Sequence, residues 1–177
     1  MKLLCLFPGI RYTCEQPLLY YAASFYHQKG YEILPILYDD RYKEMDAHKV
    51  DLSEQFEMLK PDILQSLKDI EWNQYDSIVF VSKSIGTVLA CWYAQRMNLS
   101  VRQILFTPLE QTFDYMNQNI EFVAVGDSDS FMDANKLSVF CKEREIPCEI
   151  YPGGHRLETD DIQNNLDTLK DIFSKLK

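Results

Sequence analysis

The sequence has few of the features that mark membrane or nucleic-acid-binding proteins. None of its apolar runs approaches the roughly 20 residues that a membrane-spanning helix needs. Its short apolar start is broken by Pro8-Gly9, unlike a signal peptide. Lysine and arginine total 18 against 27 acidic residues, and the formal net charge of −9 repels nucleic-acid phosphates. These absences predict a protein that binds neither membranes nor nucleic acids.

Metal, redox and nucleotide motifs are also missing. The five cysteines are an odd number without a C-x-x-C pair, and there are three histidines without ligand spacing. The sequence therefore offers neither a disulfide framework nor a zinc site. The phosphate-binding motifs G-x-x-x-x-G-K-[ST] and G-x-G-x-x-G are absent as well. We predict a protein without metal or organic cofactor, and its free thiols fit a reducing cytoplasm.

The composition is typical of one globular domain. Hydrophobic residues make up 46% and charged residues 25% of the 177 positions, without repeats or linkers. Short apolar runs alternate with helical patterns, as in parallel βαβ units. We predict a single α/β domain over 1–177, with a doubly wound, mostly parallel six-stranded sheet covered by helices on both faces. The expected strands are Leu3–Phe7, Glu32–Leu37, Ser77–Val81, Gln103–Phe106, Phe122–Val125 and Glu149–Tyr151.

Helix boundaries can be predicted for the first and last helices. Pro17 begins the first, Gly30 follows its end, and Thr159 caps the last. Region 39–74 is expected to be a helical insert, in which a proline at position 61 leaves two short helices or one kinked helix as alternatives. The expected inner faces are Leu18, Tyr21, Ala22 and Phe25 in the first helix, and Ile162, Leu166, Leu169, Phe173 and Leu176 in the last.

The third expected strand leads into Ser82-Lys83-Ser84-Ile85-Gly86, directly before a helix predicted over 87–97. Small-x-Ser-x-Gly between a strand and a helix is typical of a nucleophile elbow, a strained turn whose residues two before and two after the serine must be small. Ser84 is therefore the candidate nucleophile, and the Ile85 N–H at the helix start is placed to bind an oxyanion. The alternative is that the serine simply caps the helix.

Two other strand ends carry the partners that a serine nucleophile needs. The fifth strand is followed by G-D-S-D at 126–129, and the sixth by G-G-H at 153–155. Parallel strands bring such loops to one edge of the sheet. His155 is therefore the candidate base, and Asp127 or Asp129 the acid that orients it.

These three motifs resemble the α/β-hydrolase superfamily, in particular its small, lidless members similar to dienelactone hydrolase. The resemblance covers nearly the whole chain, and serine, acid, histidine is the chain order of that superfamily. It implies that Asp129 is the acid, because the family acid commonly follows glycine as G-x-x-D. It also implies a second oxyanion donor in the loop after the first strand, here the Ile10 N–H of Pro8-Gly9-Ile10. Ser82 stands where the family usually has glycine, and Pro8 where it usually has histidine.

The predicted function is that of a serine esterase or thioesterase acting on a small soluble acyl substrate. Ser84 attacks, His155 acts as base, Asp129 orients it, and the amides of Ile10 and Ile85 bind the oxyanion. Two alternatives remain open: a catalytically degenerate hydrolase fold, or a flavodoxin-like module that binds a small ligand or partner without turnover. Neither the substrate nor the oligomeric state is predicted.

Five further residues are weaker candidates. Arg11, Lys83 and Arg156 each adjoin a predicted site residue and are candidates for binding an anionic substrate group, with solvated surface charges as the alternative. Glu110, after the fourth strand, is a third candidate acid. Cys14 lies near the predicted oxyanion loop but has no histidine nearby in the sequence, so we expect it to be inert.

Overall fold

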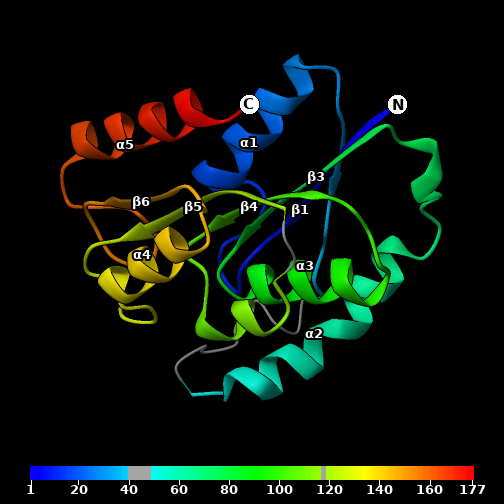
Figure 1. Cartoon of the computed structure of the whole chain (residues 1–177), viewed down its shortest axis with the longest axis horizontal. Coiled ribbons are helices and arrows are strands. Elements are labelled where there is room, and N and C mark those ends of the chain that lie inside the picture. The colour runs from blue at the N-terminus through cyan, green and yellow to red at the C-terminus, as the bar shows by residue number, and fades with distance from the viewer. Residues whose placement is uncertain (40–48, 117–118) are drawn as a thin grey trace.

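The computed structural model describes residues 1–39, 49–116 and 119–177, and it has the predicted α/β architecture (Figure 1). Six strands form one sheet in the order β2-β1-β3-β4-β5-β6, and every pairing is parallel. This confirms the doubly wound six-stranded sheet, which is parallel throughout rather than mostly. The strands are β1 (Lys2–Phe7), β2 (Glu32–Pro35), β3 (Ser77–Lys83), β4 (Arg102–Phe106), β5 (Ile120–Gly126) and β6 (Cys148–Tyr151).

Helices cover both faces of the sheet, as Figure 1 shows. On one face lie α1 (Pro17–Gln28) and α5 (Ile162–Lys175); on the other lie α2 (Leu52–Leu67), α3 (Ile85–Arg96) and α4 (Ala134–Glu143). In the part of the chain that the structure describes, the 3₁₀ helix η2 (Trp72–Gln74) follows α2, and η3 (Glu110–Asp114) follows β4. Because both faces are covered, the central strands are apolar runs rather than alternating ones. Within the described ranges, no helix has the length and apolar character needed to cross a membrane.

The ends of α1 are as predicted, whereas its inner face differs. Pro17 occupies the first turn, and Gly30 takes a φ of +79° just beyond the end, which glycine adopts without strain. Tyr21, expected inside, is 46% exposed, and Tyr26 is fully buried. The prediction for Tyr21 is therefore wrong, because the helix packs on the sheet through a face rotated away from this residue.

The start of α5 also corrects the prediction. Asp161 rather than Thr159 caps the helix, by accepting a hydrogen bond from the backbone N–H two residues later. Ile162 and Leu166, expected inside, are 70% and 49% exposed, whereas Ile172 is fully buried. The apolar side chains at the start of α5 border a surface groove beside α1 instead of entering the core.

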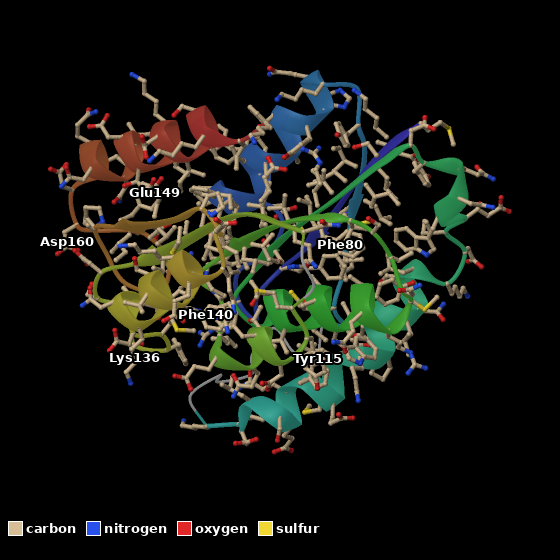
Figure 2. All side chains as sticks on the ribbon, viewed as in Figure 1. Phe80, Tyr115, Lys136, Phe140, Glu149 and Asp160 are labelled. Atoms are coloured by element: carbon tan, nitrogen blue, oxygen red, sulfur yellow. The ribbon has the colours of Figure 1, made fainter. Side chains whose placement is uncertain are left out.

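Among the described residues of region 39–74, the α-helix α2 runs through Pro61, and the short 3₁₀ helix η2 follows it. Phe56 of α2 stacks on Tyr115 with ring centroids 5.5 Å apart and meets Trp92 of α3 edge-on at 5.7 Å. Figure 2 shows Tyr115 beside α2. Of the two alternatives, the structure has one helix over Leu52–Leu67 with Pro61 inside it, rather than two short helices. Residues 40–48 of the predicted insert lie outside the described residues.

Candidate active site

The turn between β3 and α3 holds Ser84 in a strained conformation. Its φ of +56° and ψ of −127° lie in a region that residues with a side chain rarely adopt. A Cβ on Gly86 would lie 2.3 Å from the Phe7 carbonyl oxygen, so only glycine fits there. Ser82 is buried, and its hydroxyl donates to the Ile104 carbonyl at 3.2 Å. That hydrogen bond satisfies the hydroxyl that stands in place of the usual glycine.

Ser84, His155 and Asp129 form a hydrogen-bonded chain across three strand ends. His155 Nε2 lies 2.8 Å from Ser84 Oγ, and Nδ1 lies 2.8 Å from Asp129 Oδ2 and 2.9 Å from Oδ1. An ionised carboxylate can only accept hydrogen bonds, so Nδ1 carries the proton. Nε2 is then left to accept from the Ser84 hydroxyl, which is the tautomer that a base for this serine requires.

Further contacts hold the acid and the imidazole in place. The Asp129 side chain is 0% exposed, and its Oδ1 also accepts the Phe131 N–H at 2.8 Å. The Phe131 ring packs against the His155 ring, with centroids 4.6 Å apart. Because water is excluded from Asp129, its interaction with His155 is stronger than that of a surface pair.

The two alternative acids have other positions. Asp127 Oδ1 accepts the N–H of Gly153 at 3.1 Å and so ties the loop after β5 to the loop after β6. Gly153 itself has a φ of +112°, which favours glycine. Glu110 is exposed at the first residue of η3. The structure describes no hydrogen bond from either carboxylate to His155.

Both predicted oxyanion donors border the cavity beside Ser84. Ile85 is the first residue of α3, so no carbonyl within the helix accepts its N–H. Ile10 lies in a tight turn closed by two backbone hydrogen bonds between Gly9 and Tyr12, at 3.1 and 3.2 Å. A Cβ on Gly9 would lie 3.1 Å from Ser84 Cβ, so glycine lets this turn approach the nucleophile closely.

A cavity of about 280 Å³ opens at Ser84 and His155. Leu52 and Gln55, from the first turn of α2, form part of its wall, so region 39–74 contributes to the site. The apolar wall consists of Ile10, Leu52, Ile85, Leu109 and Phe131. Sequence reasoning missed Leu52, Gln55, Leu109 and Phe131, which have no motif of their own.

The three predicted cations all line this cavity, but their environments differ. Arg11 is exposed, with a φ of +59°. Arg156 is about half exposed and forms a salt bridge with Glu158 at 3.2 Å. Lys83 is only 1% exposed, and burial lowers its pKa to about 7. The structure thus separates one buried cation from two on the surface.

Cys14 does not have the environment of a nucleophile. Burial raises the pKa of its thiol to about 12, so it is protonated at neutral pH. Its Sγ faces the Leu6 and Ile36 carbonyl oxygens, each at 3.9 Å. This agrees with the expectation that Cys14 is inert.

No family model matches the chain, and no curated protein matches its sequence. Solved structures do match its fold. An α/β serine hydrolase homologue from Coxiella burnetii is 14% identical with a TM-score of 0.63, over 100% of this chain and 85% of that one. An esterase from Pyrococcus furiosus is 13% identical with a TM-score of 0.63, and the match covers 99% of this chain and 82% of the esterase. Mouse α/β hydrolase domain-containing protein 10 is 13% identical with a TM-score of 0.55, and the match covers 98% of this chain and 90% of the mouse protein.

The chain has the α/β-hydrolase fold. Within this fold Ser84 follows β3, Asp129 follows β5 and His155 follows β6, which is the chain order that the sequence predicted. At these identities the likeness establishes the fold, so chemistry has to be argued from the site itself. The narrower resemblance to dienelactone hydrolase stays a prediction.

Proposed function

We propose that the protein is a serine hydrolase that cleaves an ester, thioester or related acyl bond of a small substrate. The observation that carries the proposal is the hydrogen-bonded chain from Ser84 Oγ through His155 to the buried Asp129. A serine that only caps a helix needs neither an imidazole at 2.8 Å nor a carboxylate behind it. This α3 start also has no side-chain cap hydrogen bond from Ser84.

In the proposed mechanism, Ser84 Oγ attacks the acyl carbon while its proton passes to His155 Nε2. Asp129 stabilises the imidazolium, and the Ile10 and Ile85 N–H groups stabilise the tetrahedral oxyanion. The intermediate collapses and expels the alcohol or thiol, which takes the proton from Nε2. Water then attacks the acyl-serine, with His155 again as base, and the carboxylic acid product leaves with Ser84 restored.

The two alternative functions account for less of the site. A degenerate hydrolase fold that only binds a ligand has no need for an aligned base and acid at the nucleophile position. A flavodoxin-like module would bind flavin or nucleotide, and it leaves the strained conformation of Ser84 without a role. The hydrolase proposal uses both features.

A fluorophosphonate probe tests the proposed nucleophile. We expect it to label Ser84, because an ordinary serine hydroxyl is a poor nucleophile at neutral pH and one activated by His155 is not. Ser82, two residues before Ser84, is buried and donates its hydroxyl to the Ile104 carbonyl, so it is an internal control. Peptide mapping by mass spectrometry locates the adduct. No adduct, or an adduct on Ser82, contradicts the proposal.

Metal removal is expected to leave the activity unchanged. Across the part of the chain that the structure describes, no three His, Cys, Asp or Glu side chains gather as metal ligands. The proposed mechanism stabilises the oxyanion with backbone amides, so it needs no Lewis acid. Protein treated with EDTA and dialysed should hydrolyse a short-chain 4-nitrophenyl ester at the untreated rate. A loss of activity that zinc or magnesium restores would be incompatible with this mechanism.

A further inference from the structure

The loop after β1, which carries the proposed oxyanion donor Ile10, is built around a glycine. Gly9 directly precedes Ile10, and a Cβ on Gly9 would lie 3.1 Å from Ser84 Cβ. Glycine allows this close approach, but it also permits a wide range of backbone angles. The direction of the Ile10 N–H is therefore set by the hydrogen bonds that hold the peptide groups on either side of Gly9.

Two of these hydrogen bonds lie within the turn itself. The Gly9 N–H donates to the Tyr12 carbonyl at 3.1 Å, and the Tyr12 N–H donates to the Gly9 carbonyl at 3.2 Å. The Gly9 carbonyl and the Ile10 N–H belong to one planar trans peptide group and point in opposite directions. The bond from Tyr12 therefore orients the plane that carries the Ile10 N–H, and neither of the two bonds uses that N–H.

A third hydrogen bond comes from a part of the chain that is 30 residues away. The Tyr38 hydroxyl donates to the Pro8 carbonyl at 2.8 Å. This carbonyl belongs to the peptide group on the other side of Gly9. Desolvation raises the pKa of the Tyr38 hydroxyl well above its ordinary value, so the hydroxyl stays protonated and able to donate. With this contact, both peptide groups of Gly9 are held.

The Pro8 carbonyl also lies against the turn that presents the nucleophile. A Cβ on Gly86, two residues after Ser84, would lie 2.5 Å from the Pro8 oxygen. The Tyr38 hydroxyl thus holds a carbonyl that packs directly on the nucleophile turn. Any movement of this carbonyl changes the position of the Ile10 N–H relative to Ser84.

Tyr38 is well placed to act as an anchor because its own backbone is fixed on both sides. Two residues before it, the Ile36 N–H donates to the Leu6 carbonyl at 2.9 Å and so continues the pairing of β2 with β1. One residue after it, the Asp39 N–H donates to Asp62 Oδ2 of α2 at 3.0 Å. The sheet and α2 therefore determine where the Tyr38 hydroxyl lies.

Packing alone does not hold this loop. Besides the cavity at Ser84, a second cavity of about 450 Å³ borders it, and the described residues that line this cavity include Pro8, Ile10 and Tyr38. A segment with open space beside it has fewer close contacts than one in a packed core. The hydrogen bond from Tyr38 therefore contributes more to the position of the loop.

We propose that Tyr38 is a positioning residue for acyl hydrolysis, which holds the Ile10 N–H toward the oxyanion through the Pro8 carbonyl. This rests on the proposed serine hydrolase function. Tyr38 lines the second cavity rather than the one at Ser84, so it acts through the loop and not on the reacting atoms. The oxyanion exists only in the tetrahedral intermediates and the transition states beside them. Tyr38 therefore affects kcat rather than the binding of the ester.

The Tyr38→Phe variant tests the proposal, because it removes the hydroxyl and keeps the ring. The Pro8 carbonyl loses its partner, and rotation at Gly9 can then turn the Ile10 N–H away. Deleting an oxyanion donor outright costs about 10²–10³-fold in kcat, so a misdirected donor should cost less, about tenfold. Acylation and deacylation both pass through an oxyanion, so KM for a short-chain 4-nitrophenyl ester should stay within about twofold.

A trifluoromethyl ketone gives a second readout that depends on the oxyanion. When 1,1,1-trifluorohexan-2-one binds, Ser84 Oγ bonds to its carbonyl carbon, the carbonyl π electrons move to the oxygen, and the Ser84 proton passes to His155 Nε2. The resulting hemiketal oxyanion resembles the transition state, so its Ki should rise about as much as kcat falls. The pH profile of kcat/KM should keep its shape, because the contact between His155 and Asp129 is unchanged.

Tyr31→Phe is the matched control, because it makes the same change at the other end of β2. The Tyr31 hydroxyl lies 2.8 Å from Ser77 Oγ and accepts from the Arg102 guanidinium at 2.7 Å. Tyr31 precedes its strand whereas Ser84 follows β3, so in a parallel sheet the two lie at opposite edges. Both variants should melt at a lower temperature, but Tyr31→Phe should keep the wild-type kcat and Ki.

Titration of active sites with the fluorophosphonate probe corrects kcat for any loss of folded enzyme, and KM and Ki do not depend on enzyme concentration. Wild-type kcat and Ki in Tyr38→Phe overturn the role of Tyr38 and leave the hydrolase function standing. An equal loss of kcat in Tyr31→Phe, or a loss in Tyr38→Phe without a rise in Ki, likewise overturns it. If the wild type neither cleaves the ester nor takes the label on Ser84, both proposals fail.

Discussion

Replacing Ser84 with alanine is expected to lower kcat for ester hydrolysis by about 10⁶-fold, to the rate that binding and the oxyanion donors alone support. The change removes the attacking oxygen, and the neighbouring side chains offer no substitute. The Ser82 hydroxyl is buried and bonded to a carbonyl, and the Cys14 thiol has a pKa of about 12. Steady-state kinetics on a short-chain 4-nitrophenyl ester measure the loss.

Two controls separate chemistry from folding in that experiment. Alanine keeps the Cβ and therefore the strain of a φ near +56°, so Ser84→Ala should unfold at about the wild-type temperature. Ser82→Ala removes a buried hydrogen bond and should cost about 1 kcal/mol of stability while turnover persists. If Ser84→Ala retained more than about a hundredth of the wild-type kcat, Ser84 would not be the nucleophile.

The fold could be predicted because short apolar runs alternate along the chain with segments of helical pattern. β4 shows this well: Gln103–Phe106 are all buried, as expected for a strand covered on both faces. The face of α5 could not be predicted in the same way. Thr159 and Asp161 are both good N-caps, and only packing against the rest of the protein selects between them. The exposed Ile162 follows from that selection.

Of the candidate site, the sequence could predict the residues that lie in loops directly after strands. Ser84, Asp129 and His155 are more than 20 residues apart from one another, yet parallel strands bring all three to one edge of the sheet. The cavity wall lacks such a rule. Leu52 lines it because α2 packs beside α3, which no local pattern reveals. The burial of Lys83 was equally hidden, since a lysine in a turn is usually solvated.

Exchanging Asp129 for asparagine is expected to lower kcat by up to about 10⁴-fold, through the wrong tautomer of His155. Oδ1 of Asp129 accepts the Phe131 N–H at 2.8 Å, and asparagine keeps its oxygen there. Its NH₂ group then takes the place of Oδ2, 2.8 Å from Nδ1, and donates to it. Nε2 must carry the proton instead, so it can no longer accept one from Ser84.

Asp127→Asn is the matched comparison, because it makes the same chemical change two residues away. Its oxygen still accepts the Gly153 N–H, which Asp127 binds at 3.1 Å, so the loop and most of the activity should persist. Both variants are compared with the wild type in kcat and in melting temperature. A normal melting temperature for Asp129→Asn with a large loss of kcat locates the effect in catalysis. A larger loss of kcat in Asp127→Asn than in Asp129→Asn would assign the acid to Asp127. Because Asp127 makes no described contact with the imidazole, that result would mean that the hydrogen-bonded chain through Asp129 is not the catalytic one.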